Sequence, residues 1–360
     1  MVHVCRTLTI LACIAFAVAP EVVGAQMLTV DSAMIDVGGH RLFARWAGEG
    51  SVTIVLESGQ GATSAAWNRV FPQLAAVSRT FAYDRAGIGR SELSSTPLSP
   101  ERTIEELRRA LRSTSHAGPY IVVGWSRGGL YARMFAHRYP DDVLGLVLID
   151  PSSENTWDWV LAHKPRAEIQ AVEAQLRERG EGYWAEWQAT PQLSAAVRGG
   201  LPLPSIPVVI LTATDIPPQP NWWDQAYRDH FSTEQRGLAG RLPNARLVLA
   251  NGSGHAVQQD RPDLVVEEII GLLRGVRSDG TGRMPAESSI LARNNTFEHV
   301  WPRLMTSQMC LGSAVTGFPN PRELWSARPS LRWRAAVAPP QDLPRDRAPP
   351  RGMLPGENGR

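Results

Sequence analysis

Residues 124–129, which read Gly-Trp-Ser-Arg-Gly-Gly, decide the fold of this chain. They follow directly on Ile121-Val122-Val123, a β-branched run typical of a strand, and they open a stretch of helical periodicity that reaches about His137. A serine among glycines at a strand-to-helix junction is typical of a nucleophile elbow, where small neighbours let strand and helix approach closely. Ser126 is therefore the predicted nucleophile. The structural alternative is a glycine-rich helix start with a capping serine.

A histidine late in the chain supplies the matching base. His255 ends the glycine-rich stretch 251–255, which follows a strand predicted over residues 245–249. A histidine on a loop past the final strand can reach back over the carboxyl edge of a parallel sheet and take the proton of a serine. Ser126 and His255 are thus predicted to act together.

Short apolar runs alternate with helical periods along the rest of the chain. Residues 33–37 and 41–46 predict a hairpin around Gly38-Gly39, and residues 52–56 predict a strand that is buried on both faces. Further strands are expected at 80–83, 120–123, 144–149 and 207–211, and helices at 100–111, 126–137 and 264–273. Strands that alternate with helices imply an α/β fold with a mostly parallel sheet and right-handed crossovers.

From about residue 34 to 277 the chain resembles an α/β-hydrolase-fold serine esterase of the esterase/lipase superfamily, of the exported bacterial type. Besides Ser126 and His255, residues 83–91 (Tyr-Asp-Arg-Ala-Gly-Ile-Gly-Arg-Ser) are similar to the DxxGxGxS loop that follows the fourth strand in this family, and residues 147–151 resemble the end of its sixth strand. The resemblance implies an eight-stranded, mostly parallel sheet flanked by helices, and a catalytic order of serine, acid, histidine.

The acid of this triad has three candidates. Asp215 follows the strand predicted at 207–211 and takes the position where the family places its carboxylate, so it is preferred. Its interval to His255 is longer than the family's usual one. Asp150, at the end of the sixth strand, is used by some members of the fold, and Asp224 is the third candidate.

The resemblance also implies an oxyanion hole made by the backbone N–H groups of Gln60 and Arg127. Where the family often has His-Gly, this chain has Ser58-Gly59. No role is assigned to the Arg127 side chain, and Arg85 and Arg90 are expected to brace their loop.

These residues predict a carboxylic-ester hydrolase that forms an acyl-enzyme and requires no metal or organic cofactor. A serine nucleophile argues against the epoxide hydrolases and dehalogenases of the fold, which attack with aspartate. An amidase, peptidase or thioesterase would use the same groups. A non-catalytic ligand-binding protein on the same fold is the alternative from another class.

Aromatic residues suggest the substrate. The insertion at residues 152–206 carries no good strand and is a candidate helical lid. Three tryptophans of this insertion, Trp157, Trp184 and Trp187, are predicted to line an apolar pocket above Ser126. Trp125 and Trp223, which lie outside the insertion, are predicted to line the same pocket. This favours a bulky hydrophobic ester or lactone. The chain also resembles exported esterases that include some which open macrolide-type antibiotics, and this resemblance implies a macrolide substrate and hence a role in antibiotic resistance. Ordinary packing of the lid onto the core is the alternative.

The remaining segments set the compartment and the domain limits. Residues 1–25 resemble a signal peptide, with Arg6, an apolar run at 8–19 and small residues at 23–25. The mature protein is then periplasmic or secreted, with no stable membrane span after leader removal; an uncleaved anchor and lipidation at Cys13 are the alternatives. The core is predicted at 26–151 and 207–277, and a low-order Arg/Pro-rich tail at 278–360.

Composition limits the kinds of binding partner that are expected. A net charge of +2 gives no electrostatic case for nucleic acid, and the 3 cysteines offer neither zinc-ligand spacing nor a disulfide framework. The expected partner is a small-molecule ester, and the oligomeric state is not fixed by the sequence.

Overall fold

The computed structural model describes residues 28–198, 201–215, 224–242 and 244–278. The predicted signal peptide, and the predicted tail from residue 279 onward, lie outside the described residues. Over the ranges just given, none of the helices combines the length and the apolar character that crossing a bilayer requires.

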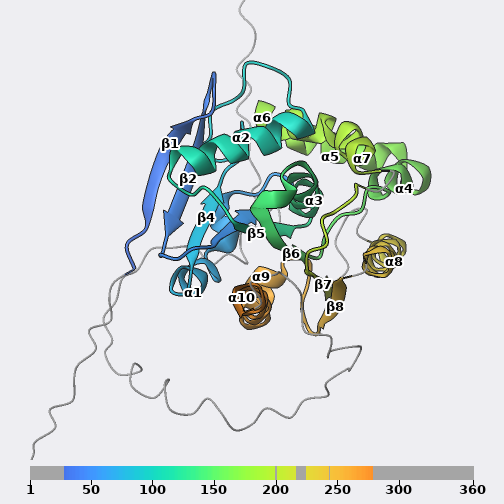
Figure 1. The fold of residues 1–360 in the computed structure, drawn as a ribbon. Coiled ribbons are helices and arrows are strands. Elements are labelled where there is room, and N and C mark those ends of the chain that lie inside the picture. The colour runs from blue at the N-terminus through green and yellow to red at the C-terminus, as the bar shows by residue number, and fades with distance from the viewer. Residues whose placement is uncertain (1–27, 199–200, 216–223, 243, 279–360) are drawn as a thin grey trace, which may run out of the picture. The chain divides into compact units, whose positions relative to one another are not determined.

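A single sheet of eight strands forms the centre of the described part, in the order β1-β2-β4-β3-β5-β6-β7-β8 (Figure 1). β2 pairs antiparallel with β1 and with β4, and every other pairing is parallel. The strands are β1 (Asp31–Asp36), β2 (Arg41–Ala47), β3 (Thr53–Glu57), β4 (Arg79–Tyr83), β5 (Tyr120–Trp125), β6 (Val143–Ile149), β7 (Val208–Ala213) and β8 (Ala245–Ala250). The predicted fold class, an eight-stranded α/β sheet that is mostly parallel, is confirmed.

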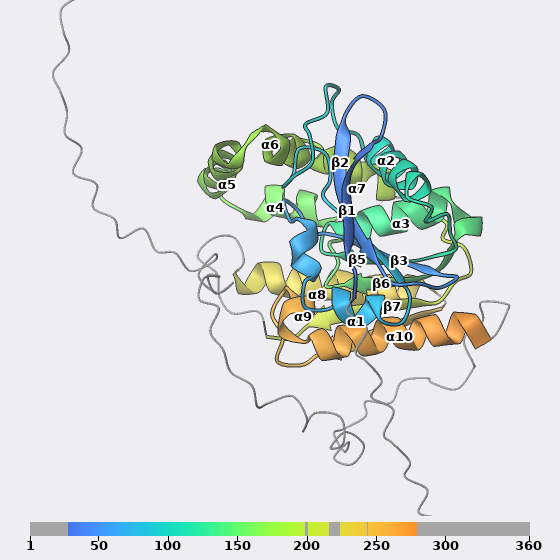
Figure 2. The same ribbon diagram turned by 90° about the vertical axis from the view of Figure 1, so that its left-hand side faces the viewer.

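Helices cover both faces of this sheet (Figure 2). α2 (Pro100–Ser113) and α3 (Gly128–Arg138) lie on one face, and α1 (Phe71–Ala75) and α10 (Pro262–Ser278) lie on the other. The central strands alternate their side chains between two apolar cores, so Val122 packs with the α3 side while Ile121 packs with the α10 side. Each fully buried side chain of this kind contributes roughly 1.5–3 kcal/mol, which is why these strands are apolar throughout.

Four helices between β6 and β7 occupy the insertion predicted at 152–206, and we call them the cap. They are α4 (Thr156–His163), α5 (Arg166–Arg179), α6 (Glu181–Gln188) and α7 (Thr190–Val197). Val160, Ile169 and Trp187 of the cap form an apolar cluster with Tyr227 and Phe231 of α8 (Gln225–Arg241). The cap therefore packs through its own small core.

Helix α2 carries a buried carboxylate. Ser99 caps the helix, because its Oγ accepts a hydrogen bond from the N–H of Arg102 at 3.2 Å. Two turns along, Glu106 is only 3% exposed, with His40 Nε2 3.5 Å from one carboxylate oxygen and Arg102 Nε 3.5 Å from the other. Burial raises the pKa of Glu106 to about 7, even though Arg102 and Arg109 act to lower it.

This shift predicts a pH-dependent stability. Since the pKa of Glu106 is higher in the folded protein than its ordinary 4.5, the stability it contributes is full below that value and is lost as pH rises through about 7. Between about pH 5 and pH 8 the wild type should lose about 1–3 kcal/mol relative to Glu106→Gln, measured by urea unfolding at both pH values. Glu105→Gln, at a half-exposed neighbour, is the control and should follow the wild type. Equal pH dependence in Glu106→Gln and the wild type would contradict the prediction.

Candidate active site

Ser126 lies in the sharp turn between β5 and α3. Its φ is +54°, a left-handed conformation that costs a residue other than glycine about 1–3 kcal/mol unless its surroundings hold it. Three backbone hydrogen bonds hold it, since the Ser126 N–H donates to Ile149 O at 3.0 Å and the Ser126 carbonyl accepts from Gly129 and Ser152. A Cβ at Gly124 would lie 2.5 Å from the Gly128 carbonyl oxygen, so strand and helix meet too closely for a side chain there. The turn has the geometry of the predicted nucleophile elbow.

Asp150 holds the candidate base. It follows the last residue of β6, is 1% exposed, and places its Oδ2 2.6 Å from His255 Nδ1. Its other oxygen accepts hydrogen bonds from the Ala213 N–H at 3.1 Å and from Gln235 Nε2 at 3.0 Å. A carboxylate with both oxygens engaged is stable when buried, and it favours the His255 tautomer that carries its proton on Nδ1. His255 Nε2 is then the nitrogen that can accept a proton.

The structure pairs His255 with Asp150 and not with Asp215, which corrects the sequence prediction. Asp215 is exposed, and its backbone N–H donates to Ser253 O at 2.9 Å. Asp224, the third candidate, caps α8 by accepting from the Tyr227 N–H at 3.0 Å and lies 2.5 Å from Lys164 Nζ. The physical reason lies in the surroundings of the two carboxylates. Asp150 is buried and its second oxygen is held by Ala213 and Gln235, whereas Asp215 is exposed.

Two aromatic side chains fix the His255 ring. Trp125 donates its Nε1–H to the His255 carbonyl at 2.8 Å, and the two rings have centroids 5.4 Å apart. The ring of Phe231 also packs against that of His255 in a T-shaped arrangement, with a centroid distance of 5.7 Å. Trp125 directly precedes Ser126, so its contact with His255 ties the base to the nucleophile turn. The contact of Trp125 with a substrate stays a prediction.

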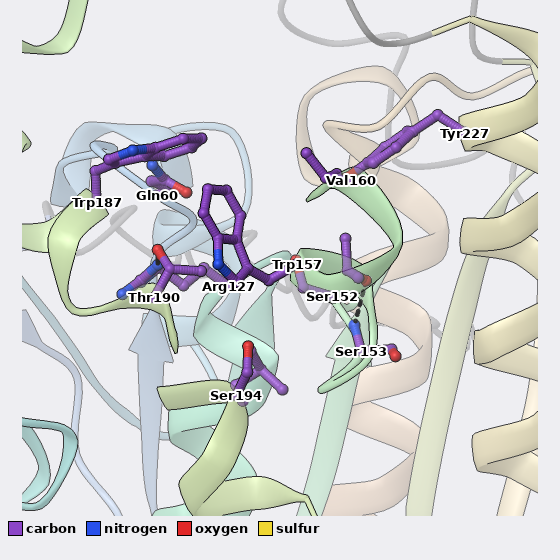
Figure 3. Close-up of a pocket in the computed structure, with 12 residues that line it drawn as sticks. Gln60, Arg127, Ser152, Ser153, Trp157, Val160, Trp187, Thr190, Ser194 and Tyr227 are labelled. Carbon is purple, nitrogen blue, oxygen red and sulfur yellow. Dashed lines mark hydrogen bonds between the residues drawn. The ribbon is translucent and has the colours of Figure 1, made fainter. Parts of the chain in front are cut away.

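A pocket lies between the cap and the nucleophile turn (Figure 3). Its empty volume is about 480 Å³, including open solvent at its mouth. Trp157 and Trp187 face each other edge-to-face with ring centroids 4.8 Å apart, and the side chain of Gln60 lies beside them. Six side chains with a hydroxyl group also line the pocket, namely Ser152, Ser153, Thr156, Thr190, Ser194 and Tyr227. Its wall therefore combines indole rings with hydroxyl groups.

Another predicted substrate contact, Trp184, is placed elsewhere. Trp184 lies in α6 with the Arg177 guanidinium 3.7 Å from its ring centroid, and it is not among the residues that line this pocket. Trp223 lies outside the described residues. Trp157 and Trp187 are thus the two predicted tryptophans that the structure brings to the pocket.

The loop after β3 lies against Ser126. A Cβ at Gly59 would lie 3.3 Å from the Ser126 Cβ, a tight contact that shows how closely the main chain passes the serine. Gln60 follows, and Arg127 is the N-cap residue of α3, whose N–H has no partner within the helix. The two predicted oxyanion donors therefore belong to segments that flank Ser126.

A buried ionic cluster, which the sequence analysis missed, lies under this loop. Arg85 is 5% exposed and donates to Glu57 Oε1 at 2.5 Å and to Glu186 Oε1 at 2.6 Å. Glu57 ends β3 and also accepts the Tyr83 O–H at 2.5 Å, whereas Glu186 comes from α6 of the cap. An available signal was the glutamate that closes the otherwise apolar, fully buried strand β3.

The charges in this cluster influence one another. Burial raises the pKa of Glu57 despite the nearby Arg85. Burial alone would also raise the pKa of Glu186, but Arg85 and Arg127 together hold it below its ordinary value. The Arg127 guanidinium donates to Thr190 Oγ1 at 2.7 Å and to the Glu186 carbonyl at 2.8 Å. The Arg127 side chain thus anchors the cap, a role that the sequence analysis did not assign.

Within the ranges that the structure describes, no three histidine, cysteine, aspartate or glutamate side chains are grouped as metal ligands would be.

Comparison with known proteins identifies several with similar sequences. It is 25% identical over 226 residues to the uncharacterized protein YqjL of Bacillus subtilis, an alignment of 61% of this chain and 82% of that protein. It is 34% identical over 111 residues to a pimeloyl-[acyl-carrier protein] methyl ester esterase of Sodalis glossinidius, over 31% of this chain and 41% of the esterase. The covered share of the curated relatives falls as low as 14%.

A solved structure with the same fold is that of a putative lipase from Acinetobacter baumannii, with a TM-score of 0.52 and 20% identity over 69% of this chain and 93% of the lipase. A family model described as the alpha/beta hydrolase family matches residues 54–268, which is more than half of the chain. With the nucleophile turn, the fold and this match in agreement, the chain belongs to the alpha/beta hydrolase family.

Proposed function

We propose that this protein is a serine hydrolase that cleaves carboxylic esters with Ser126, His255 and Asp150. The observation that carries the proposal is the 2.6 Å contact between Asp150 Oδ2 and His255 Nδ1, beside a serine held at a φ of +54°. A base oriented by a buried carboxylate, next to an elbow serine, is the arrangement that activates a hydroxyl for acyl transfer. The partial similarity to a methyl ester esterase supports an ester as the bond cleaved.

The reaction has two halves, acylation and deacylation, and in each half His255 acts first as a base and then as an acid. Ser126 Oγ attacks the acyl carbon while His255 Nε2 takes its proton, and Asp150 stabilises the imidazolium that forms. The N–H groups of Gln60 and Arg127 bind the tetrahedral oxyanion, where losing one donor costs roughly 3–4 kcal/mol. His255 then protonates the departing alcohol, which leaves Ser126 acylated. Water then attacks the acyl carbon and gives a proton to His255. His255 returns this proton to Ser126 Oγ as the ester bond breaks, so that the acid is released and the enzyme is restored.

We further propose that the substrate is a bulky ester or lactone that carries both apolar surface and oxygen substituents. Trp157 and Trp187 offer apolar faces, while hydroxyls such as Thr190 and Ser194 offer hydrogen bonds within the same pocket. Hydroxylated macrolide-type lactones have this mixed character.

The nucleophile can be tested by substitution. Ser126→Ala should reduce kcat on p-nitrophenyl acetate and butyrate by about 10⁴-fold or more, because no acyl-enzyme can form. A fluorophosphonate should label the wild type and not the variant, with mass spectrometry locating the adduct. Activity retained in folded Ser126→Ala would contradict the proposal, and so would a folded wild type that neither hydrolyses esters nor takes the label.

The choice of acid gives a second prediction. Asp150→Asn should lower kcat by about 10²–10⁴-fold with little change in KM, because an amide no longer fixes the tautomer of His255. Asp215→Asn, the matched control, should stay within about twofold of the wild type, since Asp215 is exposed. Steady-state kinetics on one p-nitrophenyl ester distinguish the two. The larger loss in Asp215→Asn would show that Asp215 acts as the acid.

The pocket gives a third prediction. Trp157→Ala should raise KM for a bulky aromatic ester about 10-fold while p-nitrophenyl acetate is affected little, because the lost indole contact is worth about 1–3 kcal/mol. Trp184→Ala, which removes a cap tryptophan that does not line the pocket, should leave the ratio of the two substrates unchanged. A ratio that changes equally in both variants would contradict the assignment of this pocket to the substrate.

A further inference from the structure

The carbonyl groups of the loop after β3 are fixed by one side chain. Arg85 donates from Nη1 to the Ser58 carbonyl and from Nη2 to the Gly59 carbonyl, both at 2.6 Å. The Gly59 carbonyl also accepts the Ala62 N–H at 3.2 Å, which closes a tight turn. Two donors on one carbonyl leave its peptide plane little freedom to rotate.

Peptide planarity carries this constraint to the neighbouring N–H. In a trans peptide the C=O of Gly59 and the N–H of Gln60 point in opposite directions. The Gly59 carbonyl points at Arg85, so the Gln60 N–H points away from Arg85. Gly59 itself lies against Ser126, with its Cβ position 3.3 Å from the Ser126 Cβ, and Gln60 lines the pocket.

Glutamates on opposite sides hold the guanidinium that sets this orientation. Glu57 of β3 binds Arg85 Nη1, and Glu186 of α6 binds Arg85 Nε. The second oxygen of Glu186 accepts the Gly61 N–H at 2.6 Å, so the cap also holds the residue that follows Gln60. The planar guanidinium of Arg85 presents its N–H donors in directions that reach both glutamates and both loop carbonyls, whereas the ammonium of a lysine cannot reach all of these acceptors.

We infer that Arg85 is a positioning residue for catalysis, which turns the N–H of Gln60 into the oxyanion hole, and that Glu186 makes the cap part of the same support. This inference rests on the proposed function. Arg85 touches no reacting atom, so its removal should slow the step in which the oxyanion forms and leave ground-state binding largely unaltered.

The experiment compares Arg85→Lys and Arg85→Met with Arg133→Met. Arg133 is the matched control because it is 4% exposed and pairs with one buried glutamate, Glu154, at 2.7 Å, but holds no carbonyl of the loop. The measurements are kcat and KM on p-nitrophenyl butyrate, the inhibition constant of a trifluoromethyl ketone that forms an oxyanion on Ser126, and the thermal midpoint. Glu186→Gln is a milder variant that keeps a neutral acceptor beside Arg85.

Both Arg85 variants should lose about 10²–10³-fold in kcat with KM changed less than about threefold, and the ketone should bind more weakly by a similar factor. Glu186→Gln should show a smaller loss of the same kind. Arg133→Met should keep the wild-type kcat and ketone affinity even if its thermal midpoint falls as far as that of the Arg85 variants.

Folded Arg85→Lys with wild-type kcat and ketone affinity would overturn the inference, and so would an equal loss of kcat in Arg133→Met. If Arg85→Met does not fold, Arg85→Lys and Glu186→Gln decide by the same criteria. A folded wild type without ester hydrolysis or fluorophosphonate labelling would instead show that the proposed function fails, and this outcome is visible before any variant is made.

Discussion

The site depends on the order of three parallel strands. β3, β5 and β6 are neighbours in the sheet, with Glu57 in register with Gly124 and Trp125 in register with Ile149. Their carboxyl ends therefore lie side by side at one edge, where the chain leaves each strand for a loop or helix. Glu57, Ser126 and Asp150 are the residues delivered there. A support for the loop after β3, a nucleophile and an acid thus come from three adjacent strand ends.

Burial of charge gives this edge its rigidity. Glu57, Arg85, Glu186 and Asp150 are each at most 5% exposed, and every one of them has several hydrogen bonds. A buried charge is tolerated only when its partners stay in place, and breaking such a pair is strongly unfavourable. The cap contributes Glu186 to this arrangement, so an ionic contact at the loop after β3 adds to the apolar packing of Leu193 and Val197 in the core. The cap is thereby fastened next to the proposed active site.

Local sequence predicted the parts of the site that depend on local geometry. The glycines around Ser126 and before His255 mark tight turns, because close main-chain approach requires glycine wherever it occurs. The strands were predictable for a similar reason, since a strand buried on both faces must be apolar throughout.

Local sequence could not decide whether Asp150 or Asp215 pairs with His255. Both follow a strand, and both lie between Ser126 and His255 in the chain. Gln235 and Ala213 distinguish them, through contacts with Asp150 across 85 and 63 residues of sequence. The pairing of Arg85 with Glu186 spans 101 residues and joins core to cap, so only the fold reveals it.

The hydrogen bond between Asp150 and His255 is the central claim, and proton NMR of the folded protein tests it most directly. A histidine N–H that is hydrogen bonded to a buried carboxylate gives a strongly deshielded proton signal, assignable to His255 by selective ¹⁵N-histidine labelling and by its loss in His255→Ala. The account predicts that this signal is present in the wild type, persists in Asp215→Asn and disappears in Asp150→Asn. A signal that survives in Asp150→Asn and vanishes in Asp215→Asn would contradict it.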